Sequence, residues 1–407
     1  MTADLPTAVD VAIVGGGIMG TSLAWALAKR GAGRVALFER SVIGAGASGR
    51  TGALLRQHYS NRPEATLVRK SFEVFANWPE VVGGPPVHTP TGLVVIVDAG
   101  PGCEENLARL HRNVAMQNAV GIPSSVISPE QLQRLQPATR VDDLTAVAFE
   151  PLSGYVDAVA ATQGMARAAM VAGAEIYEGS PVTAIATDGG RVSGIETPKG
   201  HVAAGVVVCA TGPWSSRLLA PLGLTVPIEA LRVQVAIVQR PLSLEPPHFV
   251  YLDTIAGMFC RSWGPGQTLV GLGGGDQHDP VDPDRFEMRN DPGYPATAIA
   301  AIARRIPAMA NASYLHGHAG LYDMTPDAHP IIGPAGPDGL YLMAGFSGAG
   351  FKKGPAAGQA LAELIVDGRA SLVDLDPFRL DRFTGDGWRE PWSEDEYRFA
   401  SDFGHRF

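Results

Sequence analysis

Three glycines and one carboxylate near the start of the chain have the types and spacing of a nucleotide-binding turn. Gly15, Gly17 and Gly20 form the pattern GxGxxG, and Glu39 follows 19 residues after the last of them. Glycine at these places allows a sharp turn, close approach of the backbone to a pyrophosphate, and tight packing of a helix on a strand. The N-terminus of that helix favours negative charge. An acid at Glu39 suits ribose hydroxyls and repels a 2′-phosphate, so the pattern predicts a dinucleotide other than NADP.

A strand, a helix and a second strand must position these residues. An apolar strand is predicted over residues 10–14, and a helix is predicted over residues 21–30, where Gly31 ends it. A second apolar strand over residues 35–38 leads directly to Glu39. This strand–helix–strand context is the one in which the glycine pattern binds a dinucleotide. A glycine turn that serves packing alone is the alternative.

Length and composition indicate a globular protein of two domains. The chain has 407 residues, which is more than one compact core usually holds. The net charge of −9 and the lack of a long basic run argue against a nucleic-acid partner. No apolar run reaches the roughly 20 residues of a membrane span. The first residues lack a basic and apolar leader, so a cytoplasmic location is expected.

Cysteines and histidines show no metal-binding spacing. Cys103, Cys209 and Cys260 lie far apart and form no CxxC pair, so neither an iron–sulfur cluster nor a zinc site is predicted. His316 and His318 have no third ligand at a suitable spacing. We therefore expect no metal site.

Several segments resemble the FAD-dependent D-amino acid oxidase superfamily, which includes glycine oxidase and sarcosine oxidase. After Glu39, a loop of glycine, alanine and serine stands where an NAD-binding domain would continue into another strand–helix unit. The similar segments are "GGGIMG", "FER", "GASGRTGALLR", "SPVTAI" (residues 180–185), "GVVVCATGPWSSRL" (205–218), "TPDAHPIIGP" and "GLYLMAGFSGAGFKKGPAAGQALAELIVDG" (339–368). The resemblance therefore implies that the dinucleotide is FAD.

The same resemblance implies an α/β fold, in which a Rossmann-type FAD-binding domain is interleaved with an α+β substrate domain built on an antiparallel sheet. The FAD-binding domain is expected over residues 1–85, 155–225 and 325–375. The substrate domain is expected over residues 86–154 and 226–324, and a C-terminal tail over residues 376–407. Residues 91–98 and 232–240 independently have the β-branched composition of strands. Whether the tail packs on the surface or contacts a second chain is left open.

The resemblance also implies which residues hold FAD. They are Gly15, Gly17, Ile18, Met19, Gly20, Glu39, Arg40, Ala47, Ser48, Gly49, Thr51, Gly52, Leu54, Val182, Thr211, Gly212, Trp214, Gly345, Ser347, Gly348, Gly350, Phe351 and Lys352. Residues 354–368 are predicted to form a helix whose N-terminus faces the flavin ring and stabilises negative charge on it.

The flavin is expected to be bound without a covalent tether. In monomeric sarcosine oxidase a cysteine tethers it, two residues before the tyrosine that matches Tyr322, and here that position is Gly320. Other relatives use an N-terminal histidine. His58 is the nearest candidate, but its spacing from Gly49 does not match.

Two cations are implied as the carboxylate clamp of an amino-acid substrate. Arg56 and Lys352 match the clamp positions of sarcosine oxidase, and such cations bind a carboxylate by charge-assisted hydrogen bonds. The adjacent Lys353 is expected to face solvent. Ala349 replaces a histidine of sarcosine oxidase, which enlarges the pocket and leaves the substrate open.

Two further side chains are candidates with open alternatives. Tyr251 matches a pocket tyrosine of relatives, or else it is a core aromatic. His278 lies near the place of a lysine that helps oxygen react in sarcosine oxidase, or else it is a loop histidine. A histidine would assist oxygen only when protonated.

The implied function is oxidation of the C–N bond of a small amino or N-alkyl amino acid. Hydride passes from the α-carbon to FAD, the imine hydrolyses, and O₂ reoxidises the flavin to give hydrogen peroxide. One alternative is a dehydrogenase that passes electrons to a quinone or a partner subunit. Another is a non-catalytic subunit that binds flavin for electron transfer. Whether the chain forms a homo-oligomer or joins a heteromeric assembly is left open.

Overall fold

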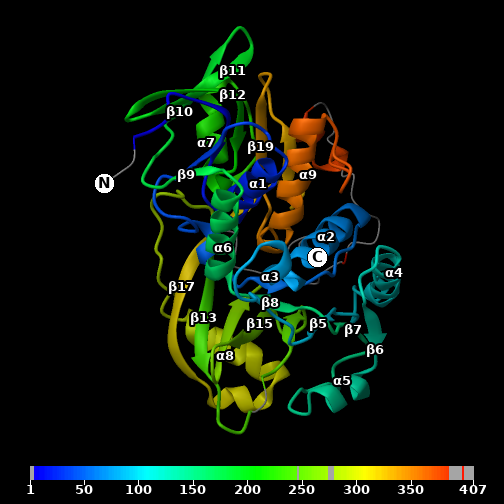
Figure 1. The fold of residues 1–407 in the computed structure, drawn as a ribbon. Coiled ribbons are helices and arrows are strands. Elements are labelled where there is room, and N and C mark those ends of the chain that lie inside the picture. The colour runs from blue at the N-terminus through cyan, green and yellow to red at the C-terminus, as the bar shows by residue number, and fades with distance from the viewer. Residues whose placement is uncertain (1–3, 245–246, 274–278, 385–396, 398–407) are drawn as a thin grey trace.

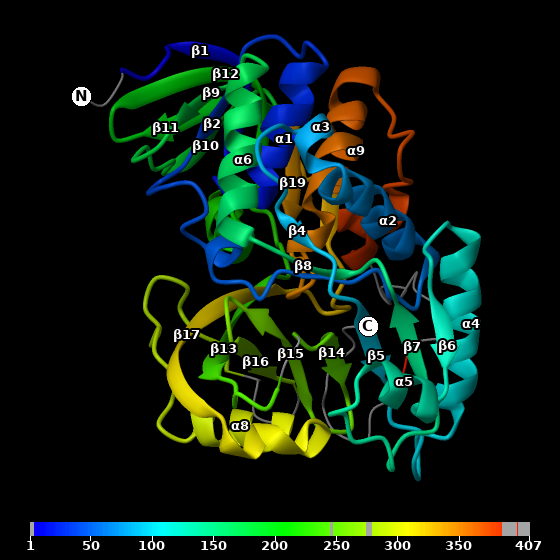
Figure 2. The ribbon, with the colours of Figure 1, turned by 60° about the horizontal axis from the view of Figure 1, so that its bottom comes forward.

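Two large sheets, with a small sheet between them, organise the chain (Figures 1 and 2). The computed structural model describes residues 4–244, 247–273, 279–384 and Tyr397. The first sheet takes its strands from residues 8–38, 175–209 and 331–344, and the second takes its strands from residues 93–150 and 229–324. The predicted interleaved α/β architecture is thus confirmed.

The first sheet is the parallel, nucleotide-binding type with an antiparallel edge. Its path is β10-β11-β12-β1-β2-β9, and β19 pairs with β12 and with β18. Strand β1 pairs in parallel with both β2 and β12, and β19 pairs in parallel with β12. The strands are β1 (Ala8–Val14), β2 (Val35–Phe38), β9 (Glu175–Tyr177), β10 (Ala184–Asp188), β11 (Arg191–Thr197), β12 (Gly200–Cys209), β18 (Ile331–Pro334) and β19 (Leu340–Ala344).

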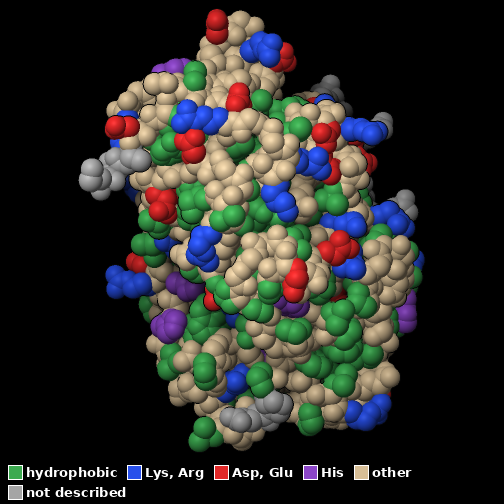
Figure 3. Space-filling view, viewed as in Figure 1, with side chains coloured by type: hydrophobic (Ala, Val, Ile, Leu, Met, Phe, Trp, Pro, Cys, Tyr) green, Lys and Arg blue, Asp and Glu red, His purple; other side chains and the backbone are tan. Residues whose placement is uncertain are grey.

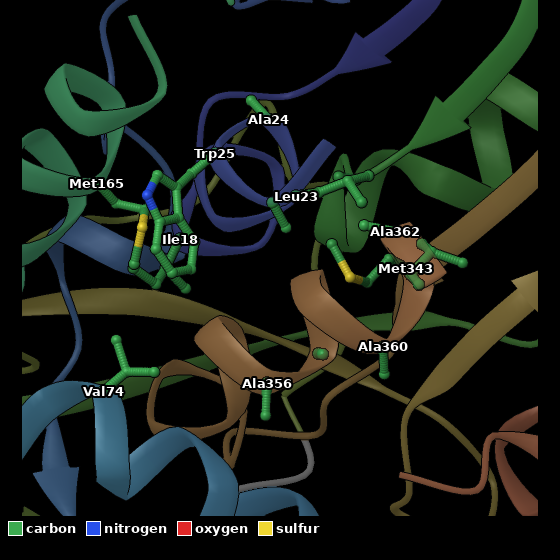
Figure 4. Packing of buried hydrophobic residues seen from close by; sticks show 14 of the residues in the cluster. Ile18, Leu23, Ala24, Trp25, Val74, Met165, Met343, Ala356, Ala360 and Ala362 are labelled. Atoms are coloured by element: carbon green, nitrogen blue, oxygen red, sulfur yellow. The ribbon is translucent and has the colours of Figure 1, made fainter. Parts of the chain in front are cut away.

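Three helices cover one face of this sheet: α1 (Ile18–Lys29), α6 (Ala158–Val171) and α9 (Gly354–Asp367). Their contact residues share one apolar cluster, in which Trp25 of α1 lies beside Met165 of α6 (Figure 4). A Cβ on Gly358 would lie 2.7 Å from the backbone nitrogen of Leu23, so only glycine allows α9 to approach α1 this closely. Gly368, in the left-handed conformation, ends α9.

The second sheet is antiparallel except for one pair. Its order is β17-β13-β16-β15-β14-β5-β7-β6, and β14 pairs with β5 in parallel. Side chains of β5 alternate between two apolar clusters, one on the side of α8 and one on the side of α4. The strands are β5 (Leu93–Ile96), β6 (Ser125–Ile127), β7 (Val147–Glu150), β13 (Glu229–Gln239), β14 (Val250–Asp253), β15 (Met258–Trp263), β16 (Gln267–Leu272) and β17 (Ser313–Met324).

The small sheet and the remaining helices complete the described chain. Strand β8 (Gly154–Val156) pairs with β3 (Leu54–Leu55) and β4 (His88–Thr89), and Figure 2 shows β4 and β8 between the two large sheets. The other helices are α2 (Arg62–Ala76), α3 (Trp78–Val81), α4 (Glu105–Ala119), α5 (Pro129–Leu135), α7 (Ser215–Leu219) and α8 (Tyr294–Arg305). The expected domain boundary between residues 154 and 155 lies within β8, a strand of the small sheet. The domain boundaries stay a prediction.

Residues 180–185, one of the segments similar to the superfamily, are only partly a strand. Residues 180–183 are irregular, and β10 begins only at Ala184. The backbone N–H of Ser180 donates to the carbonyl of Glu39 at 2.8 Å. The segment therefore bonds to the chain just after β2, at a residue far from it in sequence.

Charged side chains of both signs lie on the face that Figure 3 shows. On the face in Figure 3, acidic and basic side chains are interspersed and do not gather into one basic patch. None of the helices within the described residues is long and apolar enough to span a membrane. Those residues also contain no cluster of His, Cys, Asp and Glu that could hold a metal ion.

Candidate active site

The glycine turn has the geometry that each of its residues predicts. Gly15 has a φ of 111°, and a Cβ there would lie 2.5 Å from the carbonyl oxygen of Ala210. A Cβ on Gly20 would lie 2.0 Å from the carbonyl oxygen of Gly15, so the turn and α1 pack without room for a side chain. Gly17 is the N-cap of α1 and offers no side-chain cap. The N-cap residue of the helix therefore has no side chain, which allows a phosphate to approach its backbone.

Glu39 and Ser48 border this turn. One carboxylate oxygen of Glu39 accepts from the backbone N–H of Gly16 at 2.7 Å, and the other accepts from Ser41 at 2.8 Å. The hydroxyl of Ser48 accepts from the backbone N–H of Ile18 at 2.9 Å. The predicted ribose and phosphate contacts therefore lie side by side at the carboxyl ends of β1 and β2.

Other predicted cofactor residues lie around the same edge. Ala47–Gly49 form a single 3₁₀ turn, and Met19 lies 3.1 Å from where a Cβ of Gly350 would be. Thr211 precedes a 3₁₀ turn (Gly212–Trp214) directly after β12. Val182 lies in the irregular segment before β10.

Arg40 and Trp214 have partners on the surface that were not predicted. The guanidinium carbon of Arg40 lies 4.0 Å from the centre of the Trp214 ring, and both side chains bind one carboxylate oxygen of Asp284, at 2.9 and 2.8 Å. Since Asp284 belongs to the segment between β16 and β17, this cluster connects the two sheets near the nucleotide turn.

Two loops with strained backbone meet at a cavity of about 100 Å³. Ala53 has a φ of 47° and Ser347 has a φ of 51°, a region that non-glycine residues rarely occupy. A Cβ on Gly348 would lie 2.6 Å from the ring of Tyr322, so that ring packs directly on the loop backbone. The cavity is lined by Thr51, Gly52, Ala53, Leu54, Arg56, Leu252, Phe259, Leu272, Gly273, Tyr322, Ser347, Gly348, Ala349, Phe351 and Lys352.

The cavity brings Arg56 and Lys352 together. Arg56 is 5% exposed and donates from its guanidinium to the carbonyl of His58. Lys352 is 7% exposed, and its Nζ lies 3.4 Å from the carbonyl oxygen of Ala349. Burial, together with the positive charges of Arg56 and Lys353, holds the pKa of Lys352 well below its usual range. An arginine and a lysine in one cavity can bind a carboxylate by charge-assisted hydrogen bonds.

The prediction for Lys353 is wrong. Its side chain is fully buried and ion-paired with Glu64 of α2. The second carboxylate oxygen of Glu64 lies 2.9 Å from Nδ1 of His329. These partners hold the pKa of Glu64 below its usual range, although burial acts in the opposite direction. The two adjacent lysines point to different places because they lie on a tight 3₁₀ turn, Phe351–Lys353.

The structure does not bring Tyr251 to the cavity. The residue is fully buried in the apolar cluster on the α8 side, with its hydroxyl 2.5 Å from that of Thr139. Its neighbour Leu252 lines the cavity instead. Since side chains alternate along a strand, both residues of β14 cannot face the same side. Of the two interpretations of Tyr251, a pocket tyrosine or a core aromatic, the structure supports the core aromatic.

Two other residues considered in the sequence, His318 and Gly320, line an adjoining cleft. His278 lies outside the described residues. The Nε2 of His318 lies 3.1 Å from the carbonyl oxygen of Arg50, so this histidine belongs to the wall of an adjoining cleft. Gly320 lines that cleft too, and a Cβ there would lie 3.3 Å from Cβ of Arg50.

Two residues of β17 that the sequence did not nominate support the site. Tyr322 forms part of the cavity wall. The carboxylate of Asp323 accepts from the N–H of Gly345 at 2.7 Å, and its carbonyl accepts from the N–H of Ser347 at 3.0 Å. Burial raises the pKa of Asp323 to about 6. No local signal marks these residues, because their partners lie in a loop that follows two further strands.

The fold and the glycine turn are those of an oxidoreductase that binds a dinucleotide. The chain belongs to the family of FAD dependent oxidoreductases, whose model matches residues 10–364. It is similar to the sarcosine oxidase subunit beta of Rhodobacter capsulatus, with 26% identity over 92% of this chain and 88% of that protein.

Two solved structures extend this similarity. L-proline dehydrogenase from P. horikoshii superposes with a TM-score of 0.83 at 28% identity, covering 93% of this chain and 98% of that one. Glycine oxidase from Geobacillus kaustophilus superposes with a TM-score of 0.80 at 26% identity, covering 93% and 100%. The predicted family is confirmed, and FAD is its cofactor.

The residues present fit FAD. The uncapped start of α1, the hydroxyl of Ser48 and the carboxylate of Glu39 would hold the pyrophosphate and ribose. The loops around Ala53 and Ser347, which line the cavity, would hold the flavin ring.

Proposed function

We propose that the chain oxidises the C–N bond of a small amino acid or N-alkyl amino acid of the sarcosine, glycine or proline type. The observation that carries this proposal is the shared cavity of Arg56 and Lys352, residues from opposite ends of the chain. A cavity that holds an arginine and a lysine suits a substrate with a carboxylate. The sarcosine, proline and glycine named for the relatives share this group.

Each wall of the cavity has its own task. Arg56 and Lys352 bind and orient the substrate carboxylate, which fixes the α-carbon in one place. Leu252, Phe259 and Leu272, which also line the cavity, exclude water from it. FAD, when bound, supplies the acceptor for the hydride of the α-carbon. The resulting imine then hydrolyses in water.

The electron acceptor has two candidates. We propose O₂, with hydrogen peroxide as product, on the likeness to sarcosine oxidase subunit beta and glycine oxidase. The likeness to L-proline dehydrogenase favours the second candidate, an enzyme that passes electrons to a quinone or a partner subunit. We further propose that FAD is non-covalent, because Gly320 offers no thiol beside the cavity.

An anaerobic screen tests both parts. Sarcosine, glycine and proline are added to the flavin-loaded protein without oxygen, and methylamine serves as the control without a carboxylate. We expect at least one amino acid, but not methylamine, to bleach the flavin band. Oxygen is then admitted, or a quinone dye in its place. If no amino acid bleaches the flavin, the chain is a non-catalytic flavin-binding subunit; faster recovery with the dye than with oxygen makes it a dehydrogenase.

A further inference from the structure

Two neighbouring lysines have unequal electrostatic surroundings at the cavity. Lys353 has a full ion pair with Glu64, whose other oxygen lies beside His329. Lys352 lines the cavity, and its Nζ lies 3.4 Å from the carbonyl oxygen of Ala349. Within the described part of the chain, no carboxylate lies within 4.0 Å of Lys352 to form an ion pair with it. Glu64, the acid that forms an ion pair beside the cavity, is therefore already paired with Lys353.

Positive charge surrounds Lys352 on the protein side. Arg56 lines the same cavity and Lys353 is its neighbour, and both lower its pKa together with burial. Glu64 acts in the opposite direction but more weakly. A buried ammonium without a counter-ion is strongly unfavourable. Burial and the neighbouring positive charges therefore favour the neutral form of Lys352 in the substrate-free cavity.

We propose that Lys352 accepts the proton that a zwitterionic amino acid carries on its nitrogen, as well as binding its carboxylate. This inference rests on the proposed function and adds the chemical state of the substrate that the site takes. It also assigns the two lysines different tasks: Lys352 changes its protonation state, and Lys353 stays paired with Glu64.

The proton transfer is balanced without a further reactant. An N–H bond of the substrate ammonium breaks, its electron pair stays on the nitrogen as a lone pair, and the proton forms a new bond to Nζ of Lys352. The new lysine ammonium then has the substrate carboxylate as its counter-ion. A zwitterion has no net charge, so the buried site gains none. The amine with its free lone pair is the form from which a hydride can leave the α-carbon.

Other ionisable groups near Arg56 and Lys352 do not compete for the proton of the substrate ammonium. Burial lowers the pKa of His58 to about 3 and raises that of Glu150, which favours the neutral forms of both. Burial also raises the pKa of Tyr59. Tyr322 is the remaining ionisable side chain among the described residues that line the cavity.

A first experiment measures proton uptake without turnover. Acetate, a carboxylate with no amine, is bound to the FAD-loaded protein at pH 8, and calorimetry in two buffers of different ionisation enthalpy counts protons. We expect uptake of about one proton per site, because Lys352 must ionise beside the carboxylate. Lys352→Met should take up none. Acetate binding with no proton uptake by the parent protein would overturn the proposal.

A second experiment separates proton acceptance from carboxylate binding. Lys352→Arg keeps a cation but cannot become neutral at these pH values. At pH 7 its anaerobic flavin reduction should be about 100-fold slower than in the parent, and should rise about tenfold per pH unit towards the pKa of the free amino acid. Lys70→Arg, on the exposed side of α2, should behave as the parent. A loss in Lys352→Arg that is equal at every pH would contradict the proposal.

The two proposals fail in distinguishable ways. If no amino acid bleaches the parent flavin, the proposed function is wrong whatever the lysine variants do. If amino acids bleach it and Lys352→Arg keeps the pH profile of the parent, the function stands and the proton-acceptor role is wrong.

Discussion

The hydroxyl of Tyr397 lies 2.7 Å from Nε2 of His58, so the tail of the chain bonds to the segment that carries Arg56. Both rings are buried and stacked, with centres 5.8 Å apart. Arg56 in turn donates to the carbonyl of His58. Tyr397, the described residue of the tail, therefore packs against its own chain. It lies next to the segment that carries Arg56, which we propose binds the substrate carboxylate.

Tyr397→Phe should destabilise the protein, because Nε2 of the buried His58 loses its partner. The cost of leaving such a group unsatisfied is about 1–3 kcal/mol. We expect a thermal melt to show a Tm several degrees lower than that of the parent. Tyr314→Phe removes a hydroxyl bonded to Asn290 at an exposed site and is the matched control. Equal melting of the two variants would show that the tail contact contributes nothing.

Glu39→Ala should weaken FAD binding, because two ribose hydroxyls lose a charged acceptor worth about 1.5–3 kcal/mol. Fluorescence titration of the apoprotein with FAD measures this. Glu178→Ala is the control, because Glu178 also accepts from a backbone N–H nearby, that of Ile43 at 2.6 Å. A parent-like Kd for Glu39→Ala would place the ribose elsewhere.

Acid precipitation should release the flavin into the supernatant. Gly320 stands where monomeric sarcosine oxidase has its tethering cysteine, and it lies in the cleft next to the cavity. The absorbance of supernatant and pellet decides the question. Yellow colour that stays with the pellet would mean that another side chain holds the flavin covalently.

Arg56→Ala should raise the KM for an amino-acid substrate about 100-fold while FAD stays bound, since a charge-assisted hydrogen bond to a carboxylate contributes about 1.5–3 kcal/mol. Steady-state kinetics with the best substrate of the screen measures the effect. Any slow turnover of an amine without a carboxylate should be insensitive to the substitution. An equal loss with both substrates would argue against the carboxylate clamp.

Stability should fall as the pH decreases below about 6.5. Burial lowers the pKa of His58 to about 3 and that of His248 to about 4, so the unfolded chain binds protons that the folded one does not. Each histidine therefore contributes up to about 2 kcal/mol of destabilisation between pH 6.5 and 5. Tm values at pH 7 and 5 should differ less for His248→Gln than for the parent. His111→Gln, at an exposed site, should leave the difference unchanged.

The nucleotide half of the site could be predicted from the sequence because its information is local. Gly15, Gly20 and Glu39 lie within one strand–helix–strand unit, and their spacing alone defines their neighbours. The same holds for the helix after Gly354, whose start and end are marked by glycines. The irregular backbone of residues 180–183 has no local signal, because the partner of Ser180, the carbonyl of Glu39, is distant in sequence.

The substrate half depended on pairings that no local pattern contains. Lys352 and Lys353 are chemically identical neighbours, and what separates them is Glu64, which reaches Lys353 from α2. Tyr251 and Leu252 are adjacent in β14, and which of them faces the cavity depends on how the strand docks between β5 and β15. Tertiary packing therefore determines both which lysine is paired and which residue of β14 faces the cavity.

The interleaving of the two sheets constrains how such a chain can recombine with a relative. The second sheet takes its strands from residues 93–150 and 229–324, which are separated by strands of the first. A single genetic crossover anywhere between them would join half a sheet from one parent to half from the other. Exchange of the whole substrate side needs four crossovers, two around each segment. We therefore expect specificity in this architecture to diverge by point substitution in the cavity wall and not by shuffling of modules.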